Sequence, residues 1–311
     1  MYTIENIISA ATRQPDDILN VLVLNEDAHY YIQKLCSNMP HNFYVLEDLV
    51  KNHQWPIDKS YRNLHITQIN NINNSINFDC ILVFNRASSF ETAYNISQIY
   101  HLPIVVVDMV ASMHTAPSPF FTSLKITNAS SLFGRSGDIS VGCSQKISHS
   151  WISSSTKLSV TANYAGEQFD INNSNKEKIL IDPTMPLPYL HSLGIDPKNS
   201  NFTSDKTSCR LYVHLWKYIT PMLIDCMVSG VPVVTFKDPE LEEIINYKSC
   251  IIINDVSLIN NNEFITNILN FDNLQSIIGN AKIYTQDIQN NFLEVWTAIF
   301  QYICNIHYTR G

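Results

Sequence analysis

Short apolar runs alternate with segments of helical spacing along the first half of the chain. Buried strands are predicted at residues 20–25, 42–46, 78–84, 102–108 and 139–144. Apolar side chains recur at helical intervals in residues 27–37 and 86–100, which predicts helices there, and another helix is predicted to begin at 148–153. Strands that alternate with helices build a parallel sheet, and such a sheet binds ligands at the carboxyl ends of its strands.

A polar stretch at residues 169–178 interrupts this pattern and is predicted to be a linker. The second series that follows has predicted strands at 179–181, 209–214, 231–235 and 250–254, and predicted helices at 186–193, 220–230, 239–247 and 263–269. Residues 274–281 then lead into a long final helix at 285–303, which carries an apolar face. The chain is therefore predicted to be α/β, with two Rossmann-like halves.

Composition narrows the function classes. With 311 residues, 45% of them apolar, the chain is long enough for two domains that each bury a core. Its formal net charge of −8 argues against a protein that binds nucleic acid by electrostatics alone. The eight glycines form neither a G-x-G-x-x-G fingerprint nor a P-loop. The G-x-S-x-G elbow of serine hydrolases and the Cys/His spacing of zinc sites are also missing.

Cysteine usage and the lack of targeting segments bear on the compartment. The seven cysteines are scattered without a C-x-x-C pair, which predicts buried free thiols in a reducing environment. Residues 1–20 lack the apolar core of a signal peptide, and the apolar run at 102–113 is too short to cross a bilayer. We therefore expect a cytoplasmic protein without membrane insertion. Asn/Ile tracts such as 70–77 indicate an AT-rich genome, for example that of a virus acting in the host cytoplasm.

Residues 220–235 carry the strongest functional signal. Thr220 is a good helix N-cap, Pro221 suits the first helical position, and Gly230 suits the helix end. Residues 231–235 then read as a buried strand. The helix start offers N–H groups and a positive dipole to a phosphate. Asp225 lies one turn inside on the same face, where a carboxylate can accept two ribose hydroxyls. Together these features predict a site for a nucleoside diphosphate.

The same segment resembles the sugar-nucleotide motif of GT-B glycosyltransferases of the glycogen-synthase-like, retaining type (glycosyltransferase group 1). That motif runs roughly Pro-x-x-x-Glu-Ala-Met-Ala-x-Gly-x-Pro-Val-Val, and the matching residues are Pro221, Met227, Gly230, Pro232, Val233 and Val234. Asp225 stands where the family has a glutamate that binds the ribose. The resemblance continues through residues 243–245 and 251–255 to the late Phe292 and Trp296.

The resemblance implies the GT-B architecture of two facing Rossmann-like domains with a last helix that crosses back to the first. It places an acceptor-side domain at residues 1–165, a nucleotide-sugar domain at 175–284 and the crossing helix at 285–311. It also implies an enzyme that moves a sugar from a nucleotide-diphosphate donor, with a UDP-sugar favoured, to an acceptor hydroxyl. No cofactor or metal is required, because such enzymes hold the leaving diphosphate with a helix dipole and basic groups. The acceptor stays open between a modified DNA base and a glycan.

Candidate site residues follow from the motif and from the ends of the predicted strands. Those expected to bind the donor are Asp225, Thr220, Pro221, Met222, Lys217 and His214. Those expected at the reaction centre are His114, which the resemblance places against the donor sugar, Asp27 at the acceptor entrance, and Arg86 after the 78–84 strand. The alternatives are a surface histidine for His114, a helix cap for Asp27 and a structural histidine for His214.

The chain departs from the family pattern at two places. Lys217 stands where these enzymes usually have a further glutamate, and the Gly-Arg…Lys pair that neutralises the diphosphate is replaced by residues 183–188. An alternative is therefore a catalytically degenerate GT-B protein that serves as a binding or structural module. A sugar-nucleotide epimerase of related fold is a third hypothesis.

Overall fold

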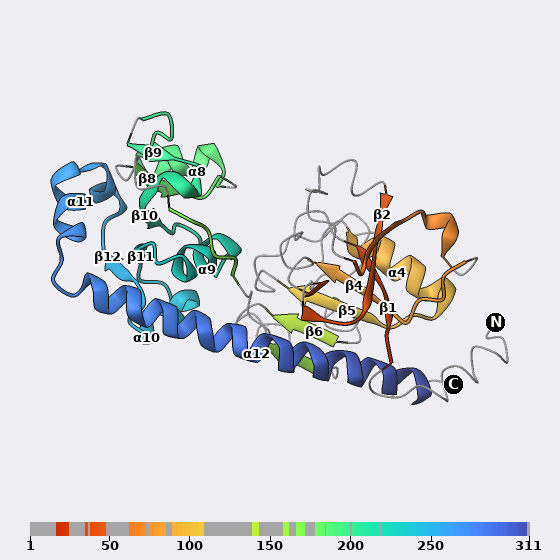
Figure 1. Cartoon of the computed structure of the whole chain (residues 1–311). Coiled ribbons are helices and arrows are strands. Elements are labelled where there is room, and N and C mark those ends of the chain that lie inside the picture. The colour runs from red at the N-terminus through yellow and green to blue at the C-terminus, as the bar shows by residue number, and fades with distance from the viewer. Residues whose placement is uncertain are drawn as a thin grey trace. The chain divides into compact units, whose positions relative to one another are not determined.

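The computed structural model describes residues 17–24, 35–36, 38–47, 62–72, 75–84, 89–108, 139–142, 158–161, 166–171, 178–183, 185–199, 201–217 and 219–309. The chain divides into two compact units (Figure 1). One comprises Met1–Asn163 together with Asn291–Gly311, and the other comprises Tyr164–Asn290.

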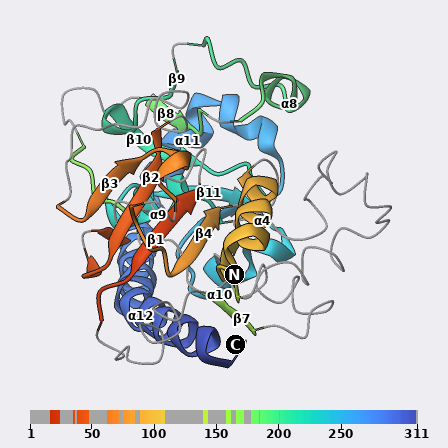
Figure 2. The same cartoon turned by 90° about the vertical axis from the view of Figure 1, so that its right-hand side faces the viewer.

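The first unit contains a parallel sheet with the strand order β3-β2-β1-β4-β5-β6-β7. Its strands are β1 (Asn20–Leu24), β2 (Asn42–Leu46), β3 (Leu64–Thr67), β4 (Cys80–Phe84), β5 (Ile104–Asp108), β6 (Ile139–Gly142) and β7 (Leu158–Thr161). Figure 2 shows β3, β2, β1 and β4 side by side. β1, β4 and β5 are buried along nearly their whole length, which explains their continuous apolar sequences.

Helix α4 (Ser89–Tyr100) packs on this sheet against β4, β1 and β5 (Figure 1). Ala93 and Ile96, one turn apart on the helix, are buried. The short 3₁₀ helix η1 (Ile69–Asn71) follows β3.

The second unit contains a smaller parallel sheet with the strand order β12-β11-β10-β8-β9. Its strands are β8 (Lys178–Ile181), β9 (Phe202–Thr203), β10 (Cys209–Val213), β11 (Val233–Phe236) and β12 (Ile251–Ile253). Its helical segments are α8 (Leu187–Ser192), η4 (Lys206–Ser208), α9 (Pro221–Val228), η5 (Pro239–Leu241), α10 (Glu242–Asn246), η6 (Val256–Asn260) and α11 (Asn262–Leu269). A core of aliphatic side chains that includes Ile181, Leu211, Val213, Val234 and Ile265 fills this unit.

The last helix, α12 (Leu274–Thr309), is continuous and contributes residues to both units. In the second unit, Tyr284 donates a hydrogen bond of 3.2 Å from its hydroxyl to Glu243 Oε1. In the first unit, the Phe300 ring packs edge-on against His41 at 4.7 Å between centroids, and against Phe43. No helix in the described part of the chain is both long and apolar enough to span a bilayer.

The predicted α/β class with two parallel sheets is confirmed. The sequence interpretation missed β3, β7 and β9, and it split α12 into a leading segment and a helix that starts at 285. β9 has only two residues, and β3 is partly exposed, so neither shows a buried apolar run. The helix predicted at 148–153 and most of the one predicted at 27–37 lie outside the described residues.

Candidate functional site at the start of α9

Local sequence sets where α9 begins and ends. Thr220 caps the helix, because its Oγ1 accepts a 3.2 Å hydrogen bond from the Leu223 N–H, and Pro221 occupies the first turn. Gly230 follows the C-cap with a φ of +76°, a left-handed conformation that suits glycine. These positions confirm the predicted helix start and end. β11 then pairs in parallel with β10.

This connectivity places the amino end of α9 at the carboxyl edge of the second sheet. β10 is the middle strand of that sheet, and α9 connects it to its parallel neighbour β11. In such a β–α–β unit the helix starts where the first strand ends, so its dipole and N–H groups face the edge at which parallel sheets bind ligands. The edge therefore has the local features of an anion site.

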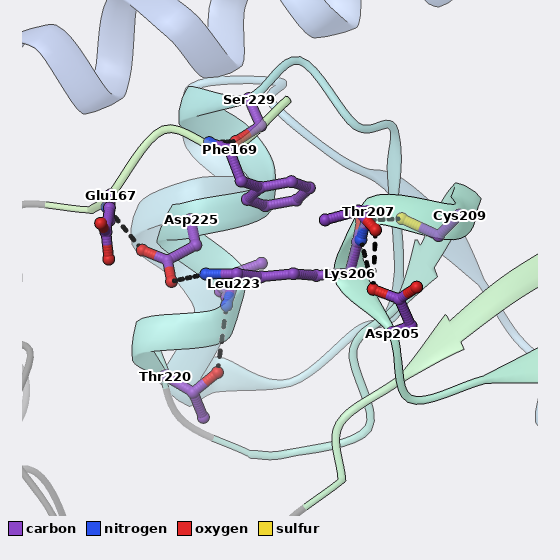
Figure 3. Close-up of polar contacts among 10 residues, drawn as sticks. All are labelled: Glu167, Phe169, Asp205, Lys206, Thr207, Cys209, Thr220, Leu223, Asp225 and Ser229. Atoms are coloured by element: carbon purple, nitrogen blue, oxygen red, sulfur yellow. Dashed lines mark hydrogen bonds and ion pairs between the residues drawn. The ribbon is translucent and has the colours of Figure 1, made fainter. Parts of the chain in front are cut away.

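Asp225, the predicted ribose ligand, lies on α9 with its carboxylate engaged by two protein groups (Figure 3). Its Oδ1 accepts a 2.6 Å hydrogen bond from the Glu167 N–H, and its Oδ2 lies 3.7 Å from Lys206 Nζ. Only 3% of the residue is exposed. A ligand hydroxyl therefore reaches this carboxylate only where one of its present neighbours gives way.

Burial raises the pKa of Asp225 to about 6. The Glu167 N–H and the Lys206 ammonium act in the opposite direction, and the charge of Glu167 adds to the increase. At pH 7 the side chain is therefore mostly ionised, and it works as an acceptor. Below pH 6 it takes up a proton and loses part of that capacity.

Residues 166–171 form the segment that occupies Asp225, and several contacts fix this segment to α9. The Phe169 N–H donates a 2.9 Å hydrogen bond to Ser229 Oγ at the end of the helix. Gly166 lies so close to Ile224 that an added Cβ would come within 2.7 Å of its Cγ2 atom. Gln289 of α12 donates a 3.5 Å hydrogen bond to the Gly166 carbonyl. The sequence analysis predicted a linker at 169–178, which includes part of this segment, and so missed its contacts with α9. The available signal in the sequence was Gly166, because the chain has only eight glycines.

Polar side chains also collect after β8 and β10. Asp182 is buried, and its Oδ2 accepts a 3.1 Å hydrogen bond from Trp216 Nε1. The His214 side chain is fully buried, with Nδ1 3.1 Å from the Tyr212 hydroxyl. The His214 carbonyl accepts a hydrogen bond from Thr235 Oγ1. His214 is thus well satisfied by protein groups, and its contact with a ligand stays a prediction.

The remaining predicted residues divide into two groups. Lys217 is exposed just after β10, and Pro221 and Met222 are half-buried in the first turn of α9. His114, Asp27 and Arg86, the predicted reaction-centre residues, lie outside the described residues. Among the described residues, no group of His, Cys, Asp and Glu side chains is arranged to hold a metal ion.

Comparison with solved structures identifies the fold. No protein-family model and no curated protein sequence matches the chain. A crystal structure of Anabaena Alr3699/HepE in complex with UDP-glucose matches with a TM-score of 0.59 and 14% identity, over 90% of this chain and 100% of that one. Sucrose-phosphate synthase from Thermosynechococcus elongatus matches with a TM-score of 0.60 and 10% identity, over 94% and 99% of the two chains.

A third match is to a putative epimerase. A putative UDP-N-acetylglucosamine 2-epimerase from Listeria monocytogenes matches with a TM-score of 0.50 and 11% identity, over 87% of this chain and 91% of that one. At these identities the likeness shows the fold alone. That fold is the one of GT-B glycosyltransferases, as the sequence motif predicted.

Proposed function

We propose that this protein is a glycosyltransferase that moves a sugar from a nucleotide-diphosphate donor, with a UDP-sugar favoured, to an acceptor hydroxyl. The observation that carries the proposal is the start of α9. A capped, proline-initiated helix begins at the carboxyl edge of the second sheet, and an acidic side chain lies one turn inside it. The GT-B fold and its likeness to a protein solved with UDP-glucose support the choice of donor.

In this proposal the phosphates bind at the first turn of α9, at Thr220, Pro221 and Met222, and Asp225 accepts the ribose hydroxyls. Lys217 and His214 complete the donor site. The helix dipole and backbone carry much of the phosphate recognition, so neither a cofactor nor a metal is needed.

The other proposed roles rest on the sequence resemblance. His114 contacts the donor sugar, Asp27 lies at the acceptor entrance, and Arg86 lies at the reaction centre. We also propose that the reaction retains the sugar's configuration and that the acceptor is a DNA base or a glycan. The protein is proposed to be viral and to act in the host cytoplasm.

The second candidate is a GT-B protein without catalytic activity that serves as a binding module. The specific observation in its favour is that Asp225 is almost wholly buried, accepts a hydrogen bond from the Glu167 N–H and forms an ion pair with Lys206. Two further residues favour this candidate. Lys217 stands in place of the family's glutamate, and Asp182, just after β8, puts a carboxylate at the edge where the phosphates of a donor would bind.

Donor turnover separates the candidates. Purified protein is incubated with UDP-, GDP- and ADP-sugars, with and without hydroxymethylated DNA or a glycan mixture, and release of the nucleoside diphosphate is followed. The transferase proposal predicts release that an acceptor accelerates. Binding of a nucleotide without turnover favours the binding module, and conversion of the donor sugar without any acceptor favours an epimerase.

A further inference from the structure

Lys206 is the cation that faces Asp225, and it comes from a separate element. It is the first residue of η4, and Asp205 caps this short helix by accepting a 3.0 Å hydrogen bond from the Thr207 N–H. Asp205 also accepts hydrogen bonds from the hydroxyls of Thr207 and Ser208. The backbone beneath Lys206 is therefore tightly fixed, which limits the positions that its ammonium group can occupy.

The aromatic ring of Phe169 restricts that ammonium further. Lys206 Nζ lies 5.1 Å from the centroid of the ring, within the range of a cation–π contact. Figure 3 shows the Lys206 side chain extended toward Asp225 beside this ring. The Lys206 side chain is 25% exposed while that of Asp225 is 4% exposed, so the pair lies at the border of the protein interior. Ion pairs at such a border are screened less than pairs on the open surface.

We propose that Lys206 is a positioning residue that keeps the Asp225 carboxylate ionised and oriented as the acceptor for the hydroxyl groups of a bound nucleotide. This inference rests on the proposed function. A carboxylate has about four lone-pair positions. The Glu167 N–H occupies one of them on Oδ1, and Lys206 forms an ion pair with Oδ2 on the other side. Because Asp225 is almost wholly buried, a ligand hydroxyl reaches it by taking the place of the Glu167 N–H. Lys206, on its own capped helix, keeps its contact with the carboxylate.

The charges around Asp225 explain why this cation matters. Glu167 is the acidic neighbour that opposes ionisation of Asp225, and Lys206 is the basic neighbour that favours it. Burial raises the pKa of Tyr212 and that of Cys226, and the nearby Asp225 charge raises each further, so both groups stay uncharged. Without Lys206, a buried carboxylate beside Glu167 would hold its proton to higher pH. A protonated carboxyl group is a poorer acceptor for two hydroxyls.

The test compares Lys206→Met, which keeps the apolar stem, with Lys206→Arg, which keeps the charge. Lys198→Met removes an exposed lysine of the same unit as a control. Carboxyl carbon NMR, with Asp225→Asn to assign the signal, follows the ionisation of Asp225 in each full-length protein. Calorimetry with UDP from pH 5 to 8.5 follows binding.

In Lys206→Met, we expect the midpoint of Asp225 ionisation and that of the UDP binding profile to move up together by roughly one pH unit or more. Affinity then falls by about twofold or more at pH 7, because half or less of Asp225 is ionised there, and it recovers at pH 8.5. Lys206→Arg and Lys198→Met keep the wild-type midpoint. A Lys206→Met protein that titrates like the wild type overturns the positioning role, as does one whose Asp225 shifts while UDP binding does not.

The two measurements, NMR of the Asp225 carboxyl group and calorimetry with UDP, keep this inference separate from the proposed function. If the wild type binds no nucleoside diphosphate, the proposed function fails together with the ligand part of the inference, and the NMR arm still decides whether Lys206 controls Asp225. Lys206→Gln replaces Lys206→Met in both arms if the methionine variant does not fold.

Discussion

His41 is a buried histidine of the first unit, and its surroundings oppose its protonation. Burial lowers its pKa to about 4. Its Nδ1 accepts a 3.3 Å hydrogen bond from the Leu19 N–H, and its ring packs edge-on against Phe300 of α12. The ring is therefore neutral in the folded protein, with its proton on Nε2.

Acid should destabilise the first unit through His41. The folded pKa lies below the ordinary value of 6.5, so its contribution is fully present above pH 6.5 and is lost as pH falls toward 4. The expected loss in the free energy of unfolding is about 3 kcal/mol. His41→Asn retains an acceptor for the Leu19 N–H and cannot titrate, so its stability should change less between pH 7 and pH 4.5. Urea unfolding at both pH values measures this, and equal pH dependence in the two proteins would contradict it.

Single residues also show what sequence can and cannot predict about the site. Thr220, Pro221 and Gly230 act locally, so their roles at the ends of α9 could be predicted from residue type and spacing. The partners of Asp225 could not, because they come from distant parts of the chain that no spacing rule connects to α9. The prediction that Asp225 binds a ribose could not take the segment at 166–171 into account for this reason.

At the scale of the element, α9 depends on its cap. Thr220→Ala removes the acceptor for the Leu223 N–H and should destabilise the helix by about 1 kcal/mol. Thr220→Ser keeps the hydroxyl and should behave nearly as the wild type. Hydrogen exchange of peptides covering residues 221–228, measured by mass spectrometry, reports this local stability. Exchange in Thr220→Ala that matches the serine variant would show that the cap contributes nothing.

The second half of α12 is held by its aromatic face. Trp296 has no exposed surface and packs beside Phe300, with ring centroids 5.6 Å apart. Trp296→Ala should reduce the free energy of unfolding by about 3–5 kcal/mol. Leu293→Ala is the matched control, because 38% of Leu293 is exposed, and it should cost far less. Comparable losses in urea unfolding of the two variants would contradict this packing.

Helices and strands could be predicted from the sequence where a long apolar run or a clear helical spacing is present. The fully buried β4 and β5 and the helix α4 follow from apolar runs and helical spacing. The predicted break in α12 was wrong, and residues 282–284 contain neither proline nor glycine that would stop a helix. Strand β9 forms by pairing with β8, and a two-residue sequence contains no pattern from which that pairing could be predicted.

At the scale of the whole molecule, the fold is better determined than the chemistry. Alternating strands and helices predicted the two parallel sheets, and solved structures with only 10–14% identity share the arrangement. A sucrose-phosphate synthase and a putative epimerase are both among these matches, so the fold does not select the reaction. The function therefore depends on the site at the start of α9 and on its ability to hold a nucleotide.

Calorimetric titration of the full-length protein with UDP at pH 7.5 shows whether the protein has a nucleotide site that includes Asp225. We predict that UDP binds and that Asp225→Asn, which retains an acceptor for the Glu167 N–H, binds it about ten- to a hundredfold more weakly. Asp272→Asn, at an exposed position of the same unit, should bind UDP as the wild type does. Wild-type affinity in Asp225→Asn, or no binding of UDP, GDP, ADP or CDP at millimolar concentration, would contradict the nucleotide site.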